Sequence, residues 1–488
     1  MTAFLDYLQF QARSRPQALA LMTPRANLSY EELLSRVRSI ARYFADNKLQ
    51  RGDILAVNVN DPTAHVCALV AAMASGIATL TVAGQRVVFP RKLAVGAMLT
   101  DHPLQASEQF RVLRVAPTWL KDLPYESELP TLRPSSEDIA RIICTSGTTG
   151  EQKAVPFTDE QLVQRVWAQV AGLRSLAGPS KTLGMMGLSS GAGFTNMMLV
   201  LMTGGSLMLA PGVAQTSRLA SLYEVDRIIA STAQLIAMLR QQDNDSVDFA
   251  GVKSMVVGGS HIPRSVAKRA RALSRNITCL YGSTEVGVVA TAPAELIIKQ
   301  QSAVGFVAPG VRVEIVDEKG TPLGLDREGV IRVNVPGAPT RYLNDPDASK
   351  NVFKDGWFYP GDIGSLTAEG LLLVSGRVSE RINAGGVKVA PNLIEDVISQ
   401  RPEVAEVAAF EHLNEDGISQ IAVAIVPHEN VDRANFNRAE LRQSVQKELR
   451  ERTPRLWMIV KEIPRTEQGK IDRPALQRLS KNRLAAVA

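Results

Sequence analysis

Strands and helices alternate along the first part of the chain, and this alternation restricts the fold more than any other feature of the sequence. A capping box begins at Ser29, and apolar residues then recur at helical spacing over residues 30–44. A strand is expected at residues 54–59, a helix over residues 62–75 and another strand at residues 78–82. Helices between successive strands favour a layered α/β domain with a largely parallel sheet.

The alternation extends into the middle of the chain and then changes. Further strands are expected at residues 206–209, 227–230 and 254–257. Over residues 311–335, short strands separated by Gly and Pro turns predict an antiparallel β subdomain. The last part of the chain holds two more strands and a charged helix around residues 438–450, which is the pattern of an α+β unit.

Length and composition bound the architecture. A chain of 488 residues is too long for one ordinary core, so two or more domains are expected, and the change of pattern after residues 376–377 favours one unit over residues 1–378 and a smaller one over residues 379–488. A composition of 45% hydrophobic and 21% charged residues is typical of a soluble globular enzyme. No apolar run reaches the length of a membrane span and no secretory signal begins the chain, so we expect a cytoplasmic protein without membrane insertion.

Charge and the metal-binding residue types exclude several functions. A net charge of +6 is mild for this length, and no basic stripe is interleaved with aromatics, so nucleic acid is not expected as a partner. The three cysteines are scattered in apolar contexts and are expected to be buried free thiols. The five histidines form no close pair, which argues against a zinc site or a Ser-His-Asp hydrolase.

A segment rich in glycine and hydroxyl residues reads Thr-Ser-Gly-Thr-Thr-Gly-Glu-Gln-Lys at residues 145–153. Glycines let successive N–H groups point at one anion, hydroxyls add donors and the lysine adds a charge, so the segment is suited to phosphates. It lacks the spacing of the common nucleotide-binding loop, and such clusters also form plain turns, so by itself it leaves both interpretations open. The candidate phosphate-binding residues are Thr145, Ser146, Gly147, Thr148, Thr149, Gly150 and Lys153.

Four more blocks follow in order. They are Tyr-Gly-Ser-Thr-Glu at residues 281–285, Tyr-Pro-Gly-Asp at 359–362, Gly-Arg at 376–377 and Pro-Arg-Thr-Glu-Gln-Gly-Lys-Ile-Asp-Arg at 464–473. With the glycine-rich segment, they resemble the adenylate-forming superfamily of acyl-CoA synthetases, peptide-synthetase adenylation domains and firefly luciferase. The resemblance covers nearly the whole chain. It implies a large N-terminal domain of layered α/β subdomains with a β subdomain, followed by a small mobile α+β lid.

The resemblance implies that ATP activates a carboxylic acid, a reaction in which charge on the phosphates and the transition state must be neutralised. It assigns adenine stacking to Tyr281, the α-phosphate to Thr284 and Mg2+ to Glu285, whose oxygens are the ligand type that Mg2+ prefers. Asp362 would accept both ribose hydroxyls, and Arg377 would donate to the same sugar. The remaining candidates for the ATP site are Gly258, Gly259, Ser260, Gly282 and Ser283.

The resemblance makes Lys470 the catalytic lysine that bridges the carboxylate and the α-phosphate oxygens during adenylation. It places a hinge at Ser379, where the superfamily usually carries Asp or Lys, so the specific role of this residue is open. Residues 382–391 resemble acyl-CoA synthetases more than peptide-synthetase domains, and Gly385 and Gly386 would line the tunnel for the pantetheine arm of coenzyme A.

The acyl pocket is expected along residues 187–194 and at the strand end near Gly258. This segment lacks the aspartate that amino-acid activators use to hold an ammonium group, so an amino-acid substrate is disfavoured. Glycines would leave room for the acid, and a larger residue at Gly193 is expected to exclude bulky acids. The candidate pocket residues are Trp167, Ser189, Ser190, Gly191, Gly193 and Gly258.

These features favour an acid:CoA ligase that uses ATP, Mg2+ and coenzyme A in two steps, acyl-AMP formation and thioester formation. An alternative is an adenylating enzyme that loads the phosphopantetheine arm of a carrier protein. A third interpretation, a catalytically silent nucleotide-binding module, is disfavoured by the joint presence of Glu285, Asp362 and Lys470. The sequence does not identify the acid.

Overall fold

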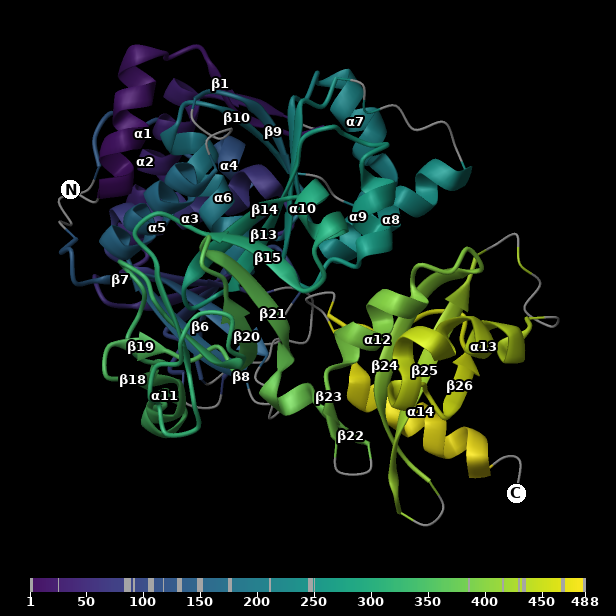
Figure 1. Ribbon diagram of the computed structural model, residues 1–488. Coiled ribbons are helices and arrows are strands. Elements are labelled where there is room, and N and C mark those ends of the chain that lie inside the picture. The colour runs from purple at the N-terminus through teal and green to yellow at the C-terminus, as the bar shows by residue number, and fades with distance from the viewer. Residues whose placement is uncertain are drawn as a thin grey trace.

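The computed structural model has a large body of sheets and helices beside a smaller unit that holds the C-terminus (Figure 1). It describes residues 3–485 except 25, 83–88, 91–92, 104–108, 117, 130–133, 147–151, 174–177, 210–211, 245–248, 250, 385–386, 415–416, 429–430, 432–435 and 467–469. The predicted α/β class, with a large N-terminal domain and a smaller C-terminal domain, is confirmed. Within the described ranges, no helix combines the length and apolar character that a membrane crossing requires.

One sheet of the core is parallel except at one edge. Its strands, in spatial order, are β6 (Arg111–Arg114), β5 (Ala97–Thr100), β3 (Ile54–Asn58), β4 (Ala78–Thr81), β7 (Ile139–Ser146) and β8 (Gln152–Thr158). The predicted helix near residue 62 is α3 (Pro62–Ala74), which Asp61 caps by accepting a hydrogen bond from Ala64 N–H at 2.8 Å. Because β8 runs antiparallel to β7, the glycine-rich segment connects two neighbouring strands.

A second, longer sheet contains parallel and antiparallel strands in one hydrogen-bonded series. After the edge strand β2 (Asn27–Ser29), which is antiparallel to β1, the parallel part is β1 (Leu19–Met22), β10 (Ser206–Leu209), β9 (Lys181–Gly184), β11 (Arg227–Ser231), β12 (Ser254–Gly258) and β13 (Ile277–Ser283). The antiparallel part is β14 (Gly287–Pro293), β15 (Ala303–Val307), β21 (Leu371–Arg377), β20 (Asp362–Leu366), β17 (Gly329–Asn334), β19 (Trp357–Phe358) and β18 (Phe353–Lys354), with β16 (Arg312–Val316) beside β17. The antiparallel strands predicted around residues 311–335 thus extend the parallel sheet.

Helices cover both faces of the long sheet. One group packs in a hydrophobic core that takes residues from both sheets, and it consists of α1 (Ala3–Ser14), α2 (Tyr30–Asp46), α3, α5 (Asp159–Gly172) and α6 (Gly191–Met202). The other group is α7 (Thr216–Leu222), α8 (Thr232–Asn244), α9 (Arg264–Ala270) and α10 (Ala294–Lys299). Connections contain the short helices α4 (Trp119–Asp122) and α11 (Pro346–Val352). The predicted capping box of α2 is present, because Ser29 and Glu32 exchange hydrogen bonds.

The C-terminal unit has its own sheet and its own hydrophobic cores. The sheet is β24 (Val404–Leu413), β25 (Ser419–Pro427) and β26 (Leu456–Ile459), and a hairpin of β22 (Ile382–Ala384) and β23 (Val387–Val389) precedes it. Its helices are α12 (Pro391–Ile398), α13 (Arg438–Leu449) and α14 (Arg473–Ala485). We refer to this unit as the lid.

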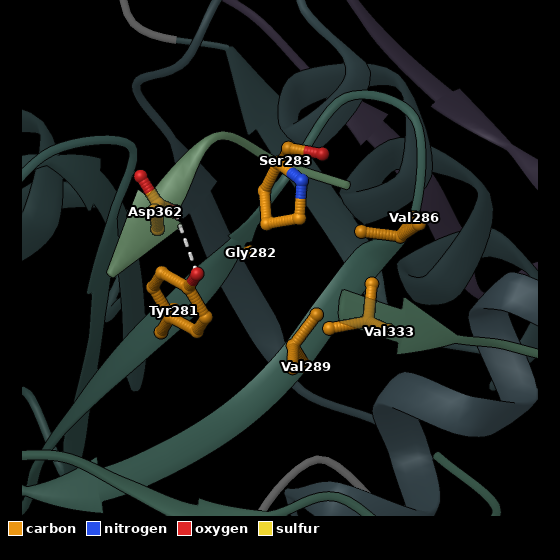
Figure 2. Close-up of a pocket in the computed structure, with 8 residues that line it drawn as sticks. Tyr281, Gly282, Ser283, Val286, Val289, Val333 and Asp362 are labelled. Atoms are coloured by element: carbon orange, nitrogen blue, oxygen red, sulfur yellow. Dashed lines mark hydrogen bonds between the residues drawn. The ribbon is translucent and has the colours of Figure 1, made fainter. Parts of the chain in front are cut away.

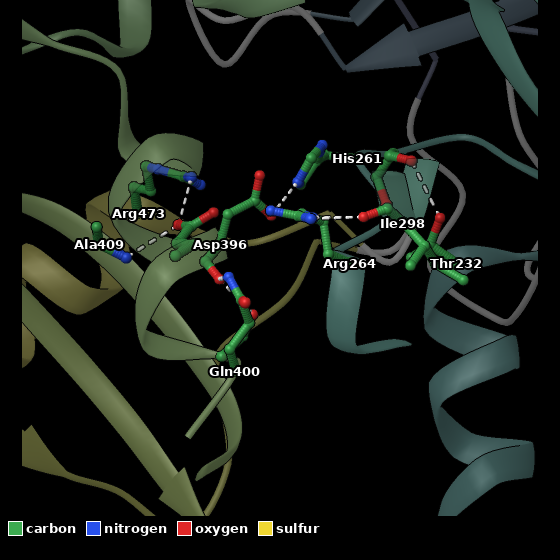
Figure 3. Close-up of polar contacts among 11 residues, drawn as sticks. Thr232, His261, Arg264, Ile298, Asp396, Gln400, Ala409 and Arg473 are labelled. Carbon is green, nitrogen blue, oxygen red and sulfur yellow. Dashed lines mark hydrogen bonds and ion pairs between the residues drawn. The ribbon is translucent and has the colours of Figure 1, made fainter. Parts of the chain in front are cut away.

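Charged side chains join the lid to the core beyond the end of β12 (Figure 3). Nε2 of His261, in the core, lies 3.0 Å from Oδ1 of Asp396 on α12. Asp396 is 1% exposed, and its Oδ2 has no hydrogen-bond partner among the described residues. A second contact pairs Arg240 on α8 with Glu406 on β24. These two ion pairs, one with the buried Asp396 and one with the partly buried Glu406, therefore contribute to where the lid docks.

The ion pair of His261 predicts a stability that depends on pH. Desolvation works to lower the pKa of His261, but Asp396, with Glu395, outweighs it and raises the pKa, while Arg473 opposes them. The pair's contribution is therefore complete below the ordinary pKa of about 6.5 and is lost as the pH rises through the raised pKa. We expect His261→Gln to lower the melting temperature more at about pH 6 than at about pH 9. An equal decrease in melting temperature at both pH values would contradict this role of the ion pair. Asp396→Asn removes the other partner, and its melting temperature should depend on pH in the same way.

Candidate active site

A buried carboxylate on the long sheet gathers two polar partners, one of which is drawn in Figure 2. Asp362 begins β20 and is 5% exposed, and its Oδ2 accepts a hydrogen bond from the hydroxyl of Tyr281 on β13 at 2.6 Å. Its Oδ1 lies 3.1 Å from Nε of Arg377, which is paired directly opposite Asp362 in the β20–β21 ladder. The structure thus brings together three residues that the sequence analysis assigned to adenosine.

Burial dominates the charge balance of this carboxyl group. Desolvation raises the pKa of Asp362. The charge of Arg377 and the hydrogen bond from Tyr281 lower it by a smaller amount, Glu380 adds to the rise and Lys470 opposes it. Although the ion pair favours the charged form, burial is the larger effect. Further donors, such as a pair of hydroxyl groups, would stabilise a carboxylate in this position.

A small recess lies beside the carboxylate. It is lined by Tyr281, Gly282, Ser283, Val286, Val289, Val333, Pro360 and Asp362. Figure 2 shows the three valines gathered on one side and the polar atoms of Tyr281 and Asp362 on the other. An apolar wall with a few polar groups is the usual lining of a small-molecule site.

The turn between β13 and β14 carries Thr284 and Glu285. A side chain on Gly282 would collide with the carbonyl oxygen of Gly287, so the bend requires glycine. Arg165, on α5, holds the turn from the helix layer, since its guanidinium donates to the carbonyl oxygen of Thr284 at 2.7 Å. The turn is therefore fixed by its own geometry and by a partly buried cation.

Glu285 has one oxygen engaged and one available. It is 8% exposed, and its Oε1 accepts a hydrogen bond from the hydroxyl of Tyr342 at 2.9 Å. Its Oε2 accepts no hydrogen bond from any residue that the structure describes. Mg2+ is commonly bound through one or two carboxylates together with substrate phosphates, and Glu285 fits that role. The described ranges contain no group of three or more His, Cys, Asp or Glu that could hold a metal without a substrate.

The glycine-rich segment begins and ends on paired strands. Thr145 lies opposite Lys153 in the β7–β8 ladder, and Ser146 lies opposite Gln152. The ammonium group of Lys153 lies 5.0 Å from the ring centre of Tyr342. Four predicted phosphate-binding residues are outside the described residues: Gly147, Thr148, Thr149 and Gly150.

Lys470 comes from the lid, on the loop before α14. Although the residue is exposed, desolvation lowers the pKa of its ammonium group and Arg377 lowers it further, whereas Glu285, Glu380 and Asp362 raise it. The groups acting on Lys470 include the predicted ATP-site residues. The ammonium group is therefore within electrostatic reach of that site even though the side chain is open to solvent.

The role predicted for Gly193 in the acyl pocket is wrong. A methyl group at this position would collide with the carbonyl oxygen of Gly187 and lie 2.6 Å from that of Met186. Gly193 therefore leaves no room for an acid; it allows the first turn of α6 to pack against the preceding backbone. The hydroxyl of Ser190 is also occupied, since it caps α6 by accepting from Gly193 N–H at 3.0 Å.

Trp167 is also placed away from the predicted pocket. It is 40% exposed, and its Nε1 donates a hydrogen bond to the hydroxyl of Tyr7 on α1 at 3.2 Å. Arg165 faces the Thr284 turn, and two positions along a helix correspond to about 200° of rotation, so Trp167 points to the opposite side. By contrast, Gly191 borders the turn, because a methyl group there would lie 3.4 Å from Cγ2 of Thr284.

The remaining predicted site residues have mixed placements. Gly258 is buried at the end of β12, where a methyl group would lie 3.1 Å from Cβ of Leu280, and Gly259 follows at a φ of 93°. The carbonyl oxygen of Ser260 accepts a hydrogen bond from Thr232 at 3.0 Å. Ser189 and Ser379 are exposed, the latter in the 3-10 turn Val378–Glu380 between core and lid. Gly385 and Gly386 lie outside the described residues.

The sequence analysis missed Arg165 and Tyr342. Arg165 lies between the buried residues Leu162 and Val166 on α5, and a cation at the edge of an apolar helix face was an available signal. Tyr342 lies 57 positions from Glu285 along the chain, and no local pattern links the two.

Two family models match most of the chain. The model of the AMP-binding enzyme family matches residues 8–343, and the model of the AMP-binding enzyme C-terminal domain matches residues 393–470. The 4-chlorobenzoate–CoA ligase of an Arthrobacter species is 25% identical over 526 aligned positions, covering 98% of this chain and 95% of that protein. The indoleacetate–CoA ligase of Aromatoleum aromaticum is 28% identical over 347 positions, covering 69% of this chain and 67% of that protein.

Solved structures share the fold over the whole chain. The anthranilate CoA ligase AuaEII in complex with anthranoyl-AMP has a TM-score of 0.87 at 18% identity, covering 100% of this chain and 98% of that chain. The o-succinylbenzoate CoA synthetase of Bacillus subtilis in complex with ATP and magnesium has a TM-score of 0.81 at 21% identity, covering 96% and 98%. The curated CoA ligases confirm the predicted enzyme class, and the predicted ATP, Mg2+ and coenzyme A are the cofactors of such ligases. The chain therefore belongs to the family of AMP-binding enzymes, within the adenylate-forming superfamily and near its acyl-CoA synthetases.

Proposed function

We propose that this enzyme activates a small carboxylic acid with ATP, giving acyl-AMP and pyrophosphate, and then transfers the acyl group to the thiol of coenzyme A. The observation that carries the proposal is the cluster of Asp362, Tyr281 and Arg377, with Glu285 on the neighbouring turn and Lys470 supplied by the lid. These residue types, in this arrangement, suit the nucleoside, the metal and the transition state respectively.

Asp362 and Arg377 bind the ribose, and the ring of Tyr281 stacks on adenine. The carboxylate of Asp362 is held from both sides before ATP arrives, so the sugar meets acceptors that need little reorganisation. Thr284 contacts the α-phosphate, and Lys153 with the hydroxyls of the glycine-rich segment takes the β- and γ-phosphates. Glu285 would hold Mg2+, which would offset charge on the phosphates when bound.

In the first half-reaction, a carboxylate oxygen of the acid forms a bond to the α-phosphorus while the bond to the pyrophosphate oxygen breaks. Lys470 donates to the oxygens whose charge increases in that transition state. In the second half-reaction, the sulfur of coenzyme A attacks the acyl carbonyl carbon, AMP leaves and the thiol proton is released.

The lid serves both half-reactions in turn. The electrostatic reach of Lys470 to Asp362 and Glu285 supports assigning the present lid position to adenylation. We place the domain boundary between residues 378 and 379, with Ser379 as the hinge, and the coenzyme A tunnel at Gly385 and Gly386. The relatives reported above are named as coenzyme A ligases, which favours coenzyme A over a carrier protein as the acceptor.

The acid enters beside Gly191, next to the Thr284 turn. The relatives are named for different acids: an aryl acid (4-chlorobenzoate), an arylacetic acid (indoleacetate) and fatty acids. An assay with several classes of acid therefore identifies the substrate class of this enzyme. Pyrophosphate release is measured with aryl, arylacetic, medium-chain and long-chain acids. We expect pyrophosphate to be released only when a suitable acid is present. When coenzyme A is added, AMP and the thioester should form in equal amounts. Release of inorganic phosphate and ADP instead would contradict the proposal.

Lys470→Ala should lower the rate of acyl-AMP formation by at least about 100-fold, because one group that stabilises developing charge is lost. Thioester formation from supplied acyl-AMP should remain close to that of the wild type, because the lid turns between the half-reactions and carries Lys470 away from the phosphate in the second. Lys461→Ala, which also removes an exposed lysine of the lid, should change neither step. Equal losses in both half-reactions for Lys470→Ala would contradict its assigned role.

Asp362→Ala should weaken ATP binding by about 1.5–3 kcal/mol for each charge-assisted hydrogen bond to the ribose that is lost. The matched variant is Tyr281→Phe, which keeps the ring for stacking and removes only the hydroxyl that donates to Asp362. We expect Tyr281→Phe to have a smaller effect than Asp362→Ala. Calorimetric titration with ATP measures both, and wild-type affinity for Asp362→Ala would remove this residue from the site.

A further inference from the structure

Tyr342 lies between two groups that the proposed function assigns to different parts of ATP. Its hydroxyl donates to Oε1 of Glu285 at 2.9 Å, and the ammonium group of Lys153 lies 5.0 Å from its ring centre. The residue is 4% exposed. One buried side chain therefore contacts both the carboxylate suited to the metal and the lysine of the phosphate-binding segment.

Tyr342 is held in one position by its surroundings. Its backbone N–H donates to Oγ of Ser349 at 2.9 Å, and its ring packs edge-on against Phe353 with centroids 5.4 Å apart. The next residue, Leu343, donates its N–H to the carbonyl oxygen of Ala154, beside Lys153, at 2.8 Å. The backbone thus ties this tyrosine to the same strand that carries the lysine.

The ring separates two opposite charges without neutralising either. No ion pair joins Lys153 to Glu285 among the described side chains. The lysine is attracted to the face of the ring, and the carboxylate accepts from the edge of the same side chain. Burial, followed by the charge and hydrogen bond of Glu285, raises the pKa of Tyr342, so the phenol keeps the proton that it donates. A direct salt bridge would instead occupy the atoms that a metal and a phosphate need.

We propose that Tyr342 is a positioning residue for adenylation, which orients Glu285 toward Mg2+ through its hydroxyl and holds Lys153 through its ring. This inference rests on the proposed function for the identities of the metal and the triphosphate. It adds a residue outside the recognised sequence blocks and gives its hydroxyl and its ring separate tasks.

The separate tasks make the proposal testable by binding alone. The dissociation constant of ATP is measured by calorimetry without the acid, once with saturating Mg2+ and once with a chelator. For Tyr342→Phe, which keeps the ring, we expect ATP binding about tenfold weaker with Mg2+ and unchanged without it, as for one lost hydrogen bond to a charged group. Tyr342→Leu, which loses the ring as well, should weaken ATP binding under both conditions.

Tyr30→Phe is the matched control. Tyr30 is fully buried, and its hydroxyl donates to the carbonyl oxygens of Leu201 and Gly205, far along the chain from the ATP-site residues. This variant loses a buried hydroxyl in the same way, and we expect unchanged ATP binding with and without Mg2+. The melting temperatures of Tyr30→Phe and Tyr342→Phe report any general loss of stability.

Glu285→Gln separates failure of this inference from failure of the proposed function. If Glu285→Gln abolishes the effect of Mg2+ on ATP binding while Tyr342→Phe behaves as the wild type, the positioning role is wrong and the metal assignment stands. If Glu285→Gln leaves the effect of Mg2+ intact, the metal assignment itself is wrong. A lower melting temperature for Tyr342→Phe with wild-type binding under both conditions would show that Tyr342 serves packing alone.

Discussion

The proposed nucleotide site depends on a carboxylate that is buried at a cost in hydration and held by two partners from the same sheet. Desolvation disfavours the ionised form of Asp362, and Arg377 and Tyr281 oppose this at hydrogen-bonding distance. All three side chains extend from strands of one hydrogen-bonded sheet, so their spacing is set by backbone ladders. Groups placed in this way are organised before the ligand arrives, which favours electrostatic stabilisation over rearrangement.

The neighbouring turn is fixed by a different means. Its residues belong to an irregular connection, and their positions depend on side chains from elsewhere: Arg165 from the helix layer and Tyr342 from the connection before α11. Removing the partly buried guanidinium of Arg165 would take away the donor that the carbonyl oxygen of Thr284 uses. Strand ladders set the nucleoside part of the site, whereas buried polar contacts set the part assigned to phosphates and metal.

Sequence reasoning succeeded where the chemistry or the periodicity is local. The helix begun at Ser29 and the strands expected at residues 54–59 and 78–82 follow from capping and apolar spacing. Asp362 and Arg377 were identified from short blocks that fall on paired strands. It failed where the answer depends on what packs against a residue. Gly193 was expected to offer space, but the carbonyl groups of the preceding turn fill it. Tyr342 carried no signal, because its partner Glu285 lies on a turn 57 positions away along the chain.

The ion pair between His261 and Asp396 holds the lid against the core without a large gain in free energy. Asp396 is 1% exposed in the docked arrangement, and its second oxygen remains without a partner among the described residues. The attraction to His261 offsets that lost hydration, and burial of an ion pair commonly leaves little net gain. In the alternation proposed above, the carboxylate would regain its water as the pair is lost. A contact with little net gain specifies the docking position without holding the lid there strongly, which suits the proposed return of the lid on every cycle.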